Sequence, residues 1–416
     1  MAERPVPQDC LPHVHNLKVE KVNSKEIPDK NALLGLIRSC MKSKNLPKLR
    51  RIHNDILRSK ILSKDMYLIT SLLTVYAKCG AIGEAHRLFD ELPRRDIISW
   101  NAIITSYSQN GFPNEVMYSF ERMRTEGFTP NAITFCLVFK ACGSLGYVEV
   151  GEQLHAEATR EGLLEHNVVL GTALVDMYGR FGLLVKAREV FDGLLARNVV
   201  SWNALITGYV KHGLGNIALK CFHEMQEKGI IPNEVTFICA LKACGSTGCL
   251  KMGEEIHAEV RRLGLLAERS NHMLGNTLVD MYAKCGMMGK ARNVFEELRV
   301  RDVVSWNALV TGYAHHGLGD EALKCFRQMR DEGIDPNEVT FIAILKACGS
   351  IGCLDIGEWI HSEIGRRPGL LAKEVALSNT LVDMYAKCGV MEKALEVFDD
   401  IPVPDVVSWN ALIVGY

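Results

Sequence analysis

Residues 199–232 read VVSWNALITGYVKHGLGNIALKCFHEMQEKGIIP, and this stretch decides the fold. Its first half carries apolar residues at the i, i+3, i+4 and i+7 positions of one helix face, namely Trp202, Leu205, Ile206 and Tyr209. Gly213 follows where a helix commonly ends, and apolar residues then return at the same period. Gly229 and Pro232 end this second segment. The stretch therefore predicts two consecutive antiparallel helices.

The same pattern recurs along the chain. Ser-Trp-Asn-Ala occurs four times, with its tryptophans at Trp100, Trp202, Trp306 and Trp409, so the spacings are 102, 104 and 103 residues. Two further blocks recur in the same order. Lys-Ala-Cys-Gly-Ser stands at 140–144, 242–246 and 346–350, and Leu-Val-Asp-Met-Tyr stands at 174–178, 278–282 and 381–385. A fixed long period of this kind indicates a repeat architecture.

Each long period divides into three helix pairs of 35, then 36 to 38, then 31 residues. We call these the 35-residue, long and 31-residue repeats. A pair of helices this short cannot bury its own apolar face, so it must stack on its neighbours. We therefore predict an all-α fold, an α-solenoid superhelix without a sheet. The array is expected over residues 30–416, with about 11 complete repeats and a truncated one from 406, after a disordered leader at 1–29.

Composition excludes several classes of protein. Of the 416 residues, 48% are hydrophobic and 23% charged, which is ordinary for a folded protein. No apolar run reaches the ~18 residues of a membrane span, so we expect no membrane partner. Lys and Arg number 48 against 49 Asp and Glu, a net charge of −1. A polyanionic partner would therefore need a local basic stripe.

The repeat resembles a known family. The string Val-Val-Ser-Trp-Asn-Ala-Leu-Ile at 199–206, with the later Gly-Tyr, His-Gly and Pro-Asn, is similar to the pentatricopeptide repeat. The alternation of 35, about 36 and 31 residues resembles the P, L and S motifs of its PLS subgroup. The phrase Leu-Val-Asp-Met-Tyr-Ala-Lys-Cys-Gly at 278–286 and 381–389 is typical of the S motif. The tetratricopeptide repeat is the nearest competitor, but its strict 34-residue period does not fit the 31-residue copies.

The resemblance implies binding of single-stranded RNA, one base per repeat. In the family, the fifth and last residues of a repeat read the base. In the 31-residue repeats these positions hold Thr70 with Asp96, Thr172 with Asn198, Asn276 with Asp302, and Asn379 with Asp405. In the 35-residue repeats they hold Asn101 with Asn131, Asn203 with Asn233, and Asn307 with Asn337, and Asn410 begins a further copy. The residues implied to pack against base faces are Ile98, Val200, Val304 and Val407.

The resemblance also implies base preferences. It assigns G to the first 31-residue repeat, A to the second and U to the third and fourth, and it assigns C over U to the 35-residue repeats. The long repeats have Leu34, Cys136, Ile238 and Ile342 at the fifth position. These side chains cannot pair with a base edge, so we assign the long repeats no preference. The footprint from 5′ to 3′ is N-G-Y-N-A-Y-N-U-Y-N-U, where Y is a pyrimidine.

A purely structural role competes with base reading. Each Asn after a Trp could serve the first helical turn, and each Asn after a Pro is a good turn residue. Variation favours base reading, because Thr and Asn, and Asp and Asn, exchange while the surrounding motif stays nearly fixed. The repeated tryptophans, and the tyrosines at the end of Leu-Val-Asp-Met-Tyr, are expected in the core.

We expect no catalytic or metal site and no cofactor. His155-Ala-Glu157, His257-Ala-Glu259 and His361-Ser-Glu363 match half of the zinc deaminase signature, but the Cys-x-x-Cys half does not occur in the sequence. They recur once per long repeat, which indicates a structural role. No phosphate-binding loop or nucleophile elbow occurs.

Three functions remain open. The first is sequence-specific RNA binding that serves C-to-U editing or another RNA-processing step, possible partners being a deaminase or another processing protein in trans. The second is a protein-interaction scaffold, which the net charge keeps open. The third is the recognition part of an editing enzyme, since the chain stops within a repeat and is expected to be truncated. The family implies a mitochondrial or chloroplast location, although residues 1–29 show no clear transit peptide.

Overall fold

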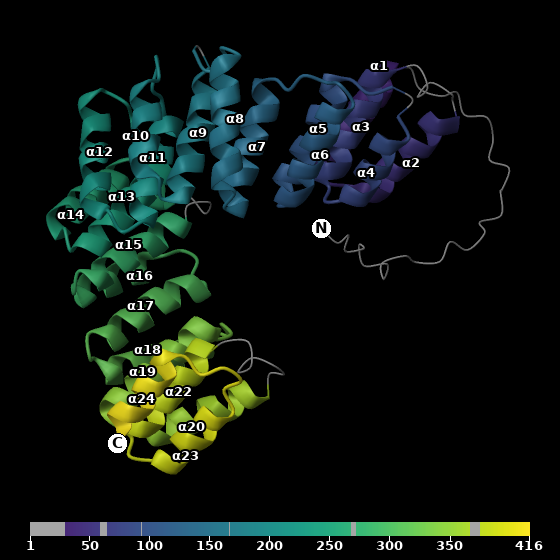
Figure 1. Ribbon diagram of the computed structural model, residues 1–416. Coiled ribbons are helices and arrows are strands. Elements are labelled where there is room, and N and C mark those ends of the chain that lie inside the picture. The colour runs from purple at the N-terminus through teal and green to yellow at the C-terminus, as the bar shows by residue number, and fades with distance from the viewer. Residues whose placement is uncertain (1–29, 59–64, 93, 166, 268–271, 367–374) are drawn as a thin grey trace, which may run out of the picture. The chain divides into compact units, whose positions relative to one another are not determined.

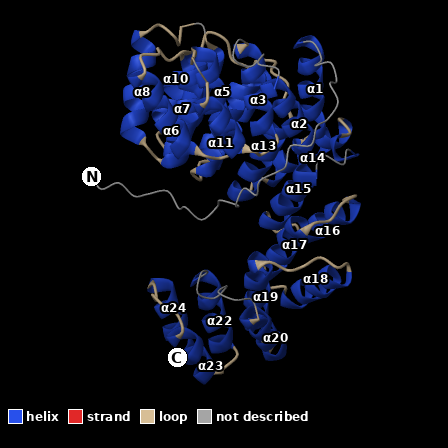
Figure 2. Cartoon of the chain, turned by 90° about the vertical axis from the view of Figure 1, so that its right-hand side faces the viewer, coloured by secondary structure: helices blue, strands red, loops and turns tan. Residues whose placement is uncertain are grey.

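The computed structural model describes residues 30–58, 65–92, 94–165, 167–267, 272–366 and 375–416 (Figure 1). The leader predicted at 1–29 lies outside these residues. The described residues form two compact units, one up to Thr129 and one from Pro130 onward. Figure 2 shows only helices and loops in this part of the chain. The predicted all-α fold is confirmed.

The first unit contains three helix pairs. They are α1 (Lys30–Ser43) with α2 (Leu46–Arg58), α3 (Met66–Lys78) with α4 (Ile82–Asp90), and α5 (Ile97–Gln109) with α6 (Pro113–Thr125). In order, they are a long, a 31-residue and a 35-residue repeat. The first helix of each pair packs on the first helix of the next, so that α1, α3 and α5 form one layer.

The second unit continues the same order. Its helices are α7 (Ala132–Leu145), α8 (Val148–Arg160), α9 (Val168–Phe181), α10 (Leu184–Asp192), α11 (Val199–Lys211), α12 (Gly215–Glu227), α13 (Glu234–Thr247), α14 (Leu250–Arg262), α15 (His272–Lys284), α16 (Met288–Glu297), α17 (Val303–His315), α18 (Gly319–Asp331), α19 (Glu338–Ile351), α20 (Leu354–Gly365), α22 (Val375–Lys387), α23 (Met391–Asp399) and α24 (Val406–Gly415). A short 3-10 helix, η2 (Leu265–Ala267), follows α14. The odd-numbered helices from α7 to α19, then α22 and α24, form the layer of first helices.

The 31-residue repeats are shorter because their second helix is shorter. That helix has 9 or 10 residues in α4, α10, α16 and α23, against 13 in α6, α12 and α18. The difference is close to one helical turn. The first helices keep 13 or 14 residues in all complete repeats, so the layer that they form is uniform.

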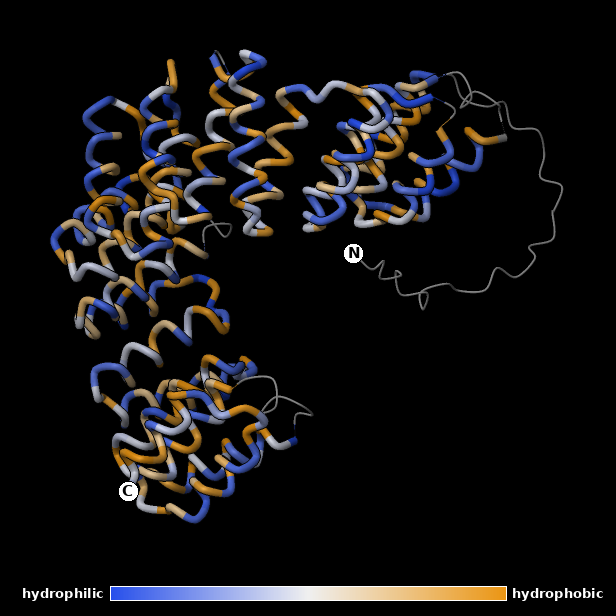
Figure 3. The backbone as a smooth tube through the Cα atoms, viewed as in Figure 1, coloured by the Kyte–Doolittle hydropathy of each residue, from blue (hydrophilic) through white to orange (hydrophobic). Residues whose placement is uncertain are grey.

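Within each unit, the apolar stripes of neighbouring helices meet in a core. Hydrophobic and hydrophilic residues alternate along the helices, as the colours of Figure 3 show. Trp100, Trp202 and Trp306 are at most 1% exposed, and each ring lies edge-on to a phenylalanine of the preceding second helix. These three were predicted in the core correctly. The prediction was wrong for Trp409, which touches Phe398 but is 52% exposed, since no described helix packs on its other side.

The repeated tyrosines are buried, as predicted, and each bonds to a histidine. The hydroxyl groups of Tyr76, Tyr178, Tyr282 and Tyr385 lie 2.8–2.9 Å from Nδ1 of His53, His155, His257 and His361 on the preceding second helix. Burial lowers the pKa of each of these histidines. Three of them belong to the His-x-Glu triplets, whose histidines therefore join one repeat to the next.

Candidate nucleic-acid interface

Seven of the first helices begin at a reciprocal polar cap. The residue that ends the preceding repeat accepts hydrogen bonds from the first-turn N–H groups, and a Ser or Thr three residues on bonds back to it. This reciprocal cap occurs at Asp96, Asn131, Asn198, Asn233, Asp302, Asn337 and Asp405. All seven were predicted to read bases. Each also holds a helix start, which is the structural role that the sequence left open.

The predicted partners of these caps lie one turn inside the preceding first helix. In the 35-residue repeats, Asn203 Nδ2 donates to Asn233 Oδ1 at 3.0 Å, and Asn307 Nδ2 donates to Asn337 Oδ1 at 2.9 Å. Thr236 and Thr340 donate to the Oδ1 atoms of Asn203 and Asn307 at 2.7 and 2.6 Å. Two residues 30 positions apart thus form one polar unit.

The third and fourth 31-residue repeats use the same geometry with an acid. Asn276 Nδ2 donates to Asp302 Oδ1 at 3.0 Å, and Asn379 Nδ2 donates to Asp405 Oδ1 at 3.1 Å. Hydrogen bonds from the Ser408 backbone and side chain lower the pKa of Asp405, so this carboxylate is ionised at neutral pH. Asn276 and Asn379 are only 5% and 6% exposed, and neither caps a helix.

The first two 31-residue repeats differ. The hydroxyl of Thr70 donates to the Met66 carbonyl at 2.7 Å, and that of Thr172 donates to the Val168 carbonyl at 2.6 Å. Each threonine therefore bonds within its own helix. Asn101 belongs to the first unit and Asn131 to the second.

The cap uses only one of the two polar side-chain atoms of the Asn or Asp that ends a repeat, and the other polar atom stays available. In Asn198, Asn233 and Asn337, Oδ1 accepts the first-turn N–H groups, while Nδ2 has no hydrogen-bond partner among the described residues. These three residues are exposed. In Asp302 and Asp405, Oδ1 likewise accepts the hydrogen bond from the first-turn N–H group. An exposed amide donor is thus offered where the residue is Asn, and a carboxylate oxygen where it is Asp.

An exposed apolar side chain stands beside each polar unit. Ile98, Val200, Val304 and Val407, predicted to pack on bases, are 56–63% exposed. Sequence reasoning missed further members, which occupy the same second position of a first helix and are 50–69% exposed: Tyr67, Ile133, Val169, Val235, Met273 and Val339. Their fixed place after the helix start was the signal that could have found them.

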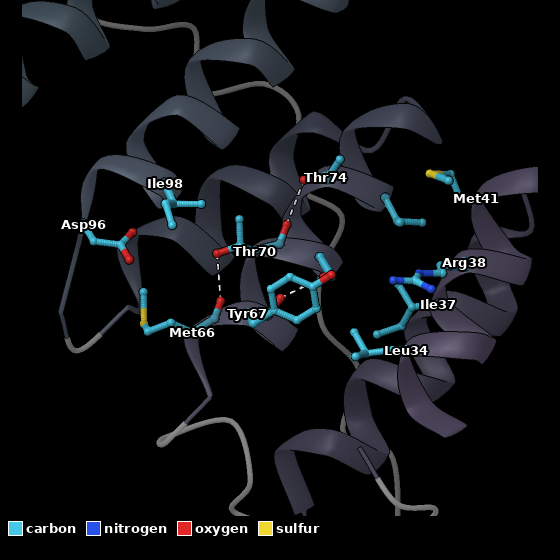
Figure 4. Close-up of a pocket in the computed structure, with 12 residues that line it drawn as sticks. Leu34, Ile37, Arg38, Met41, Met66, Tyr67, Thr70, Thr74, Asp96 and Ile98 are labelled. Atoms are coloured by element: carbon cyan, nitrogen blue, oxygen red, sulfur yellow. Dashed lines mark hydrogen bonds between the residues drawn. The ribbon is translucent and has the colours of Figure 1, made fainter. Parts of the chain in front are cut away.

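Three of these side chains, Tyr67, Ile98 and Val407, line grooves between successive first helices. One groove of about 480 Å³ in the first unit is lined by Leu34, Arg38, Tyr67, Thr70, Asp96 and Ile98, among others. Figure 4 shows Leu34 and Arg38 on one side of it and Asp96 and Ile98 on the other, with Thr70 and Tyr67 between them. An equivalent groove of about 520 Å³ in the second unit is lined by residues of α19, α22 and α24, including Ile342, Asn379, Asp405, Val407 and Asn410.

The described side chains contain no group of three or more His, Cys, Asp or Glu that could hold a metal ion. Among the helices that the structure describes, none is both long and apolar enough to span a bilayer.

Stacked two-helix repeats, several of them joined by a polar pair beside an exposed apolar side chain, define an α-solenoid whose first helices form one layer. The family model described as "PPR repeat family" matches residues 95–144, 197–246 and 301–350, and the one described as "PPR repeat" matches 68–97, 172–199, 276–303 and 377–402. The chain belongs to the pentatricopeptide repeat (PPR) family.

Curated relatives support this assignment. A chloroplastic pentatricopeptide repeat-containing protein of Arabidopsis thaliana is 35% identical over 381 residues, which cover 92% of this chain and 60% of that protein. A mitochondrial one from the same plant is 36% identical over 408 residues, covering 92% of this chain and 44% of that protein. The chain spans about half the length of these relatives.

Solved structures share the fold. The crystal structure of the pentatricopeptide repeat protein PPR10 from maize matches with a TM-score of 0.58 at 20% identity, covering 94% of this chain and 61% of that one. The same maize protein in complex with an 18-nt psaJ RNA element matches with the same TM-score at 21% identity.

Proposed function

We propose that this protein binds single-stranded RNA in a sequence-specific manner, one base per 35-residue or 31-residue repeat. The observation that carries the proposal is the cap geometry. One end of the terminal Asn or Asp is fixed by the helix start, and the other end is presented beside an exposed apolar side chain. A base could pack on that side chain and place its edge against the polar atom.

The chemistry of the presented atom gives a base preference without reference to the family. Uracil and guanine carry an N–H donor at the centre of their pairing edge, so they suit the acceptor oxygen of Asp302 or Asp405. Cytosine and adenine carry an acceptor there, so they suit the amide of Asn233 or Asn337. This supports U or G for the third and fourth 31-residue repeats and C or A for the 35-residue repeats, and the family resemblance favours U and C among these.

We further propose that the chain is of the PLS subgroup and acts in a plant organelle. The support is the alternation of 35, long and 31-residue repeats and the chloroplastic and mitochondrial relatives. Its role would be to select a site for C-to-U editing or another RNA-processing step, with a deaminase or another processing protein supplied in trans.

The test is binding of a labelled 11-mer, N-G-C-N-A-C-N-U-C-N-U, against an 11-mer with purines and pyrimidines exchanged at the read positions. We expect tighter binding of the first RNA. Asn233→Asp should shift the preference at the sixth base from C toward U and leave the other positions unchanged. A good discrimination at one base is worth about 1–3 kcal/mol.

Lys220→Gln, on the second helix α12, is the matched control and should change no preference. Equal binding of both RNAs would reject base reading and leave only phosphate attraction. Failure to bind either RNA at low salt would reject RNA binding for this chain and favour the protein-interaction scaffold.

A further inference from the structure

The long repeats carry an apolar residue at the fifth position, yet each also carries a cation one turn further along the same helix. These cations are Arg38 on α1, Lys140 on α7, Lys242 on α13 and Lys346 on α19. All four are exposed, and none forms an ion pair with a carboxylate among the described residues. The period of about 100 residues that places the tryptophans therefore also places one unpaired cation per long repeat.

These cations lie beside the base-reading positions. Lys346 lines the groove that also contains Asn379 and Asp405, and Arg38 lines the groove that contains Thr70 and Asp96 (Figure 4). The remaining two occupy the same position in their helices. Lys242 lies three residues before Gly245, where an added Cβ would come within 3.3 Å of Lys284 Cδ on α15. The stem of Lys284, in the next 31-residue repeat, therefore lies against α13 at Gly245, about one turn beyond Lys242.

The neighbouring cations are already neutralised. Arg180, Lys284 and Lys387 each contact an aspartate of their own helix at 2.7 Å. Asp405 adds a further negative charge to the groove of α19, α22 and α24. Lys346 balances the charge of Asp405 in this groove. Without Lys346 the groove would carry a net negative charge and would repel an anionic strand.

A compact ammonium on a flexible stem suits a phosphate oxygen, and a single strand brings one phosphate for each base. We propose that the long repeats bind the RNA backbone, each holding one phosphodiester through its unpaired cation, while the 35-residue and 31-residue repeats read bases. This inference rests on the proposed RNA binding. It assigns Arg38, Lys140, Lys242 and Lys346 as a phosphate-binding set spaced once per three repeats.

The experiment compares two triple variants of the full chain over a salt series, with the same 11-mer RNAs. The first is Lys140→Gln, Lys242→Gln and Lys346→Gln. The second, matched in charge, is Lys220→Gln, Lys251→Gln and Arg327→Gln, which changes exposed second-helix residues that form no ion pair among the described residues. Circular dichroism melting checks that both variants are folded.

Each lost phosphate contact to a single strand lowers the slope of log K against log salt by about 0.7, which is about fivefold in affinity at about 0.1 M salt. We expect the first variant to lose about 2 from the slope and on the order of 100-fold in affinity, with its base preference unchanged. The second variant should match the wild type in slope.

Equal slopes for the two triple variants would overturn the phosphate assignment while the wild type still bound RNA with its base preference. A changed base preference at an unchanged slope would also overturn it, because the lysines would then act on bases. If the wild-type chain binds no RNA at low salt, the proposed function fails first, and the phosphate assignment falls with it.

Discussion

The side-chain amide of Asn307 donates a 2.9 Å hydrogen bond to the side chain of Asn337, which caps the next first helix. Because the cap and the exposed edge of Asn337 use different atoms, stability and base preference can be separated. Asn337→Ala should cost about 1 kcal/mol through loss of the cap. Asn337→Asp keeps Oδ1 and should leave the melting temperature nearly unchanged while shifting the preferred base from C toward U.

Thermal melting and the 11-mer binding assay measure the two effects in the same variants. A large loss of stability in Asn337→Asp would show that Nδ2 is needed for folding. An unchanged base preference in a stable Asn337→Asp would show that the exposed edge of Asn337 does not contact the base.

Helices α15 and α17 approach closely at Gly312. A Cβ on Gly312 would lie 2.7 Å from the Cβ of Ala283 and 3.1 Å from Met288 Cε. Gly312→Ala should therefore destabilise the chain by about 1–3 kcal/mol through overpacking. Gly289→Ala adds the same methyl group where nothing lies within 4 Å, and should stay within about 0.5 kcal/mol of the wild type. Chemical denaturation compares the two, and equal stability would contradict the close approach.

The half-buried histidines that bond to the core tyrosines make stability depend on pH. Burial lowers the pKa of His155, His257 and His361 below the usual 6.5, so the unfolded chain binds protons more readily than the folded one. The stability that these neutral histidines contribute is fully present above pH 6.5 and is lost as the pH falls below that value. We expect the melting temperature to fall between pH 7.5 and 5.5.

The triple variant His155→Gln, His257→Gln and His361→Gln should show a smaller fall over that range, because glutamine does not titrate. Parallel curves for the wild type and the triple variant would assign the pH dependence to other groups.

Tyr67 is the aromatic member of the exposed apolar set, at 57% exposure, and lies in one groove with Thr70 and Ile98. Stacking of a base on an aromatic ring is worth about 1–3 kcal/mol, so Tyr67→Ala should weaken RNA binding by that amount. Val169→Ala, at the same helix position, should cost less because an aliphatic side chain does not stack. Equal losses in direct binding measurements would argue against a base on Tyr67.

The helices and the core were predictable because their signal is local. The 3.6-residue period can be read within one helix. Gly213 directly follows α11, and each recurring tryptophan stands in a short motif of its own. The bond between Asn203 and Asn233 is not local, since it requires two stacked first helices. The division at Thr129 and Pro130 has no counterpart in the repeat pattern. Val235 and Met273 were missed because a count of apolar residues does not tell an exposed helix start from a buried face.

The reciprocal cap has a consequence for how such a protein changes over generations. Asn and Asp codons differ by a single purine transition, and both residues hold the same helix start through Oδ1. Such a mutation alters the polar edge that the chain offers while leaving its fold nearly untouched. Under the proposed RNA binding, selection on this position acts mainly through the bound base, and a lineage acquires new targets without first losing a stable scaffold.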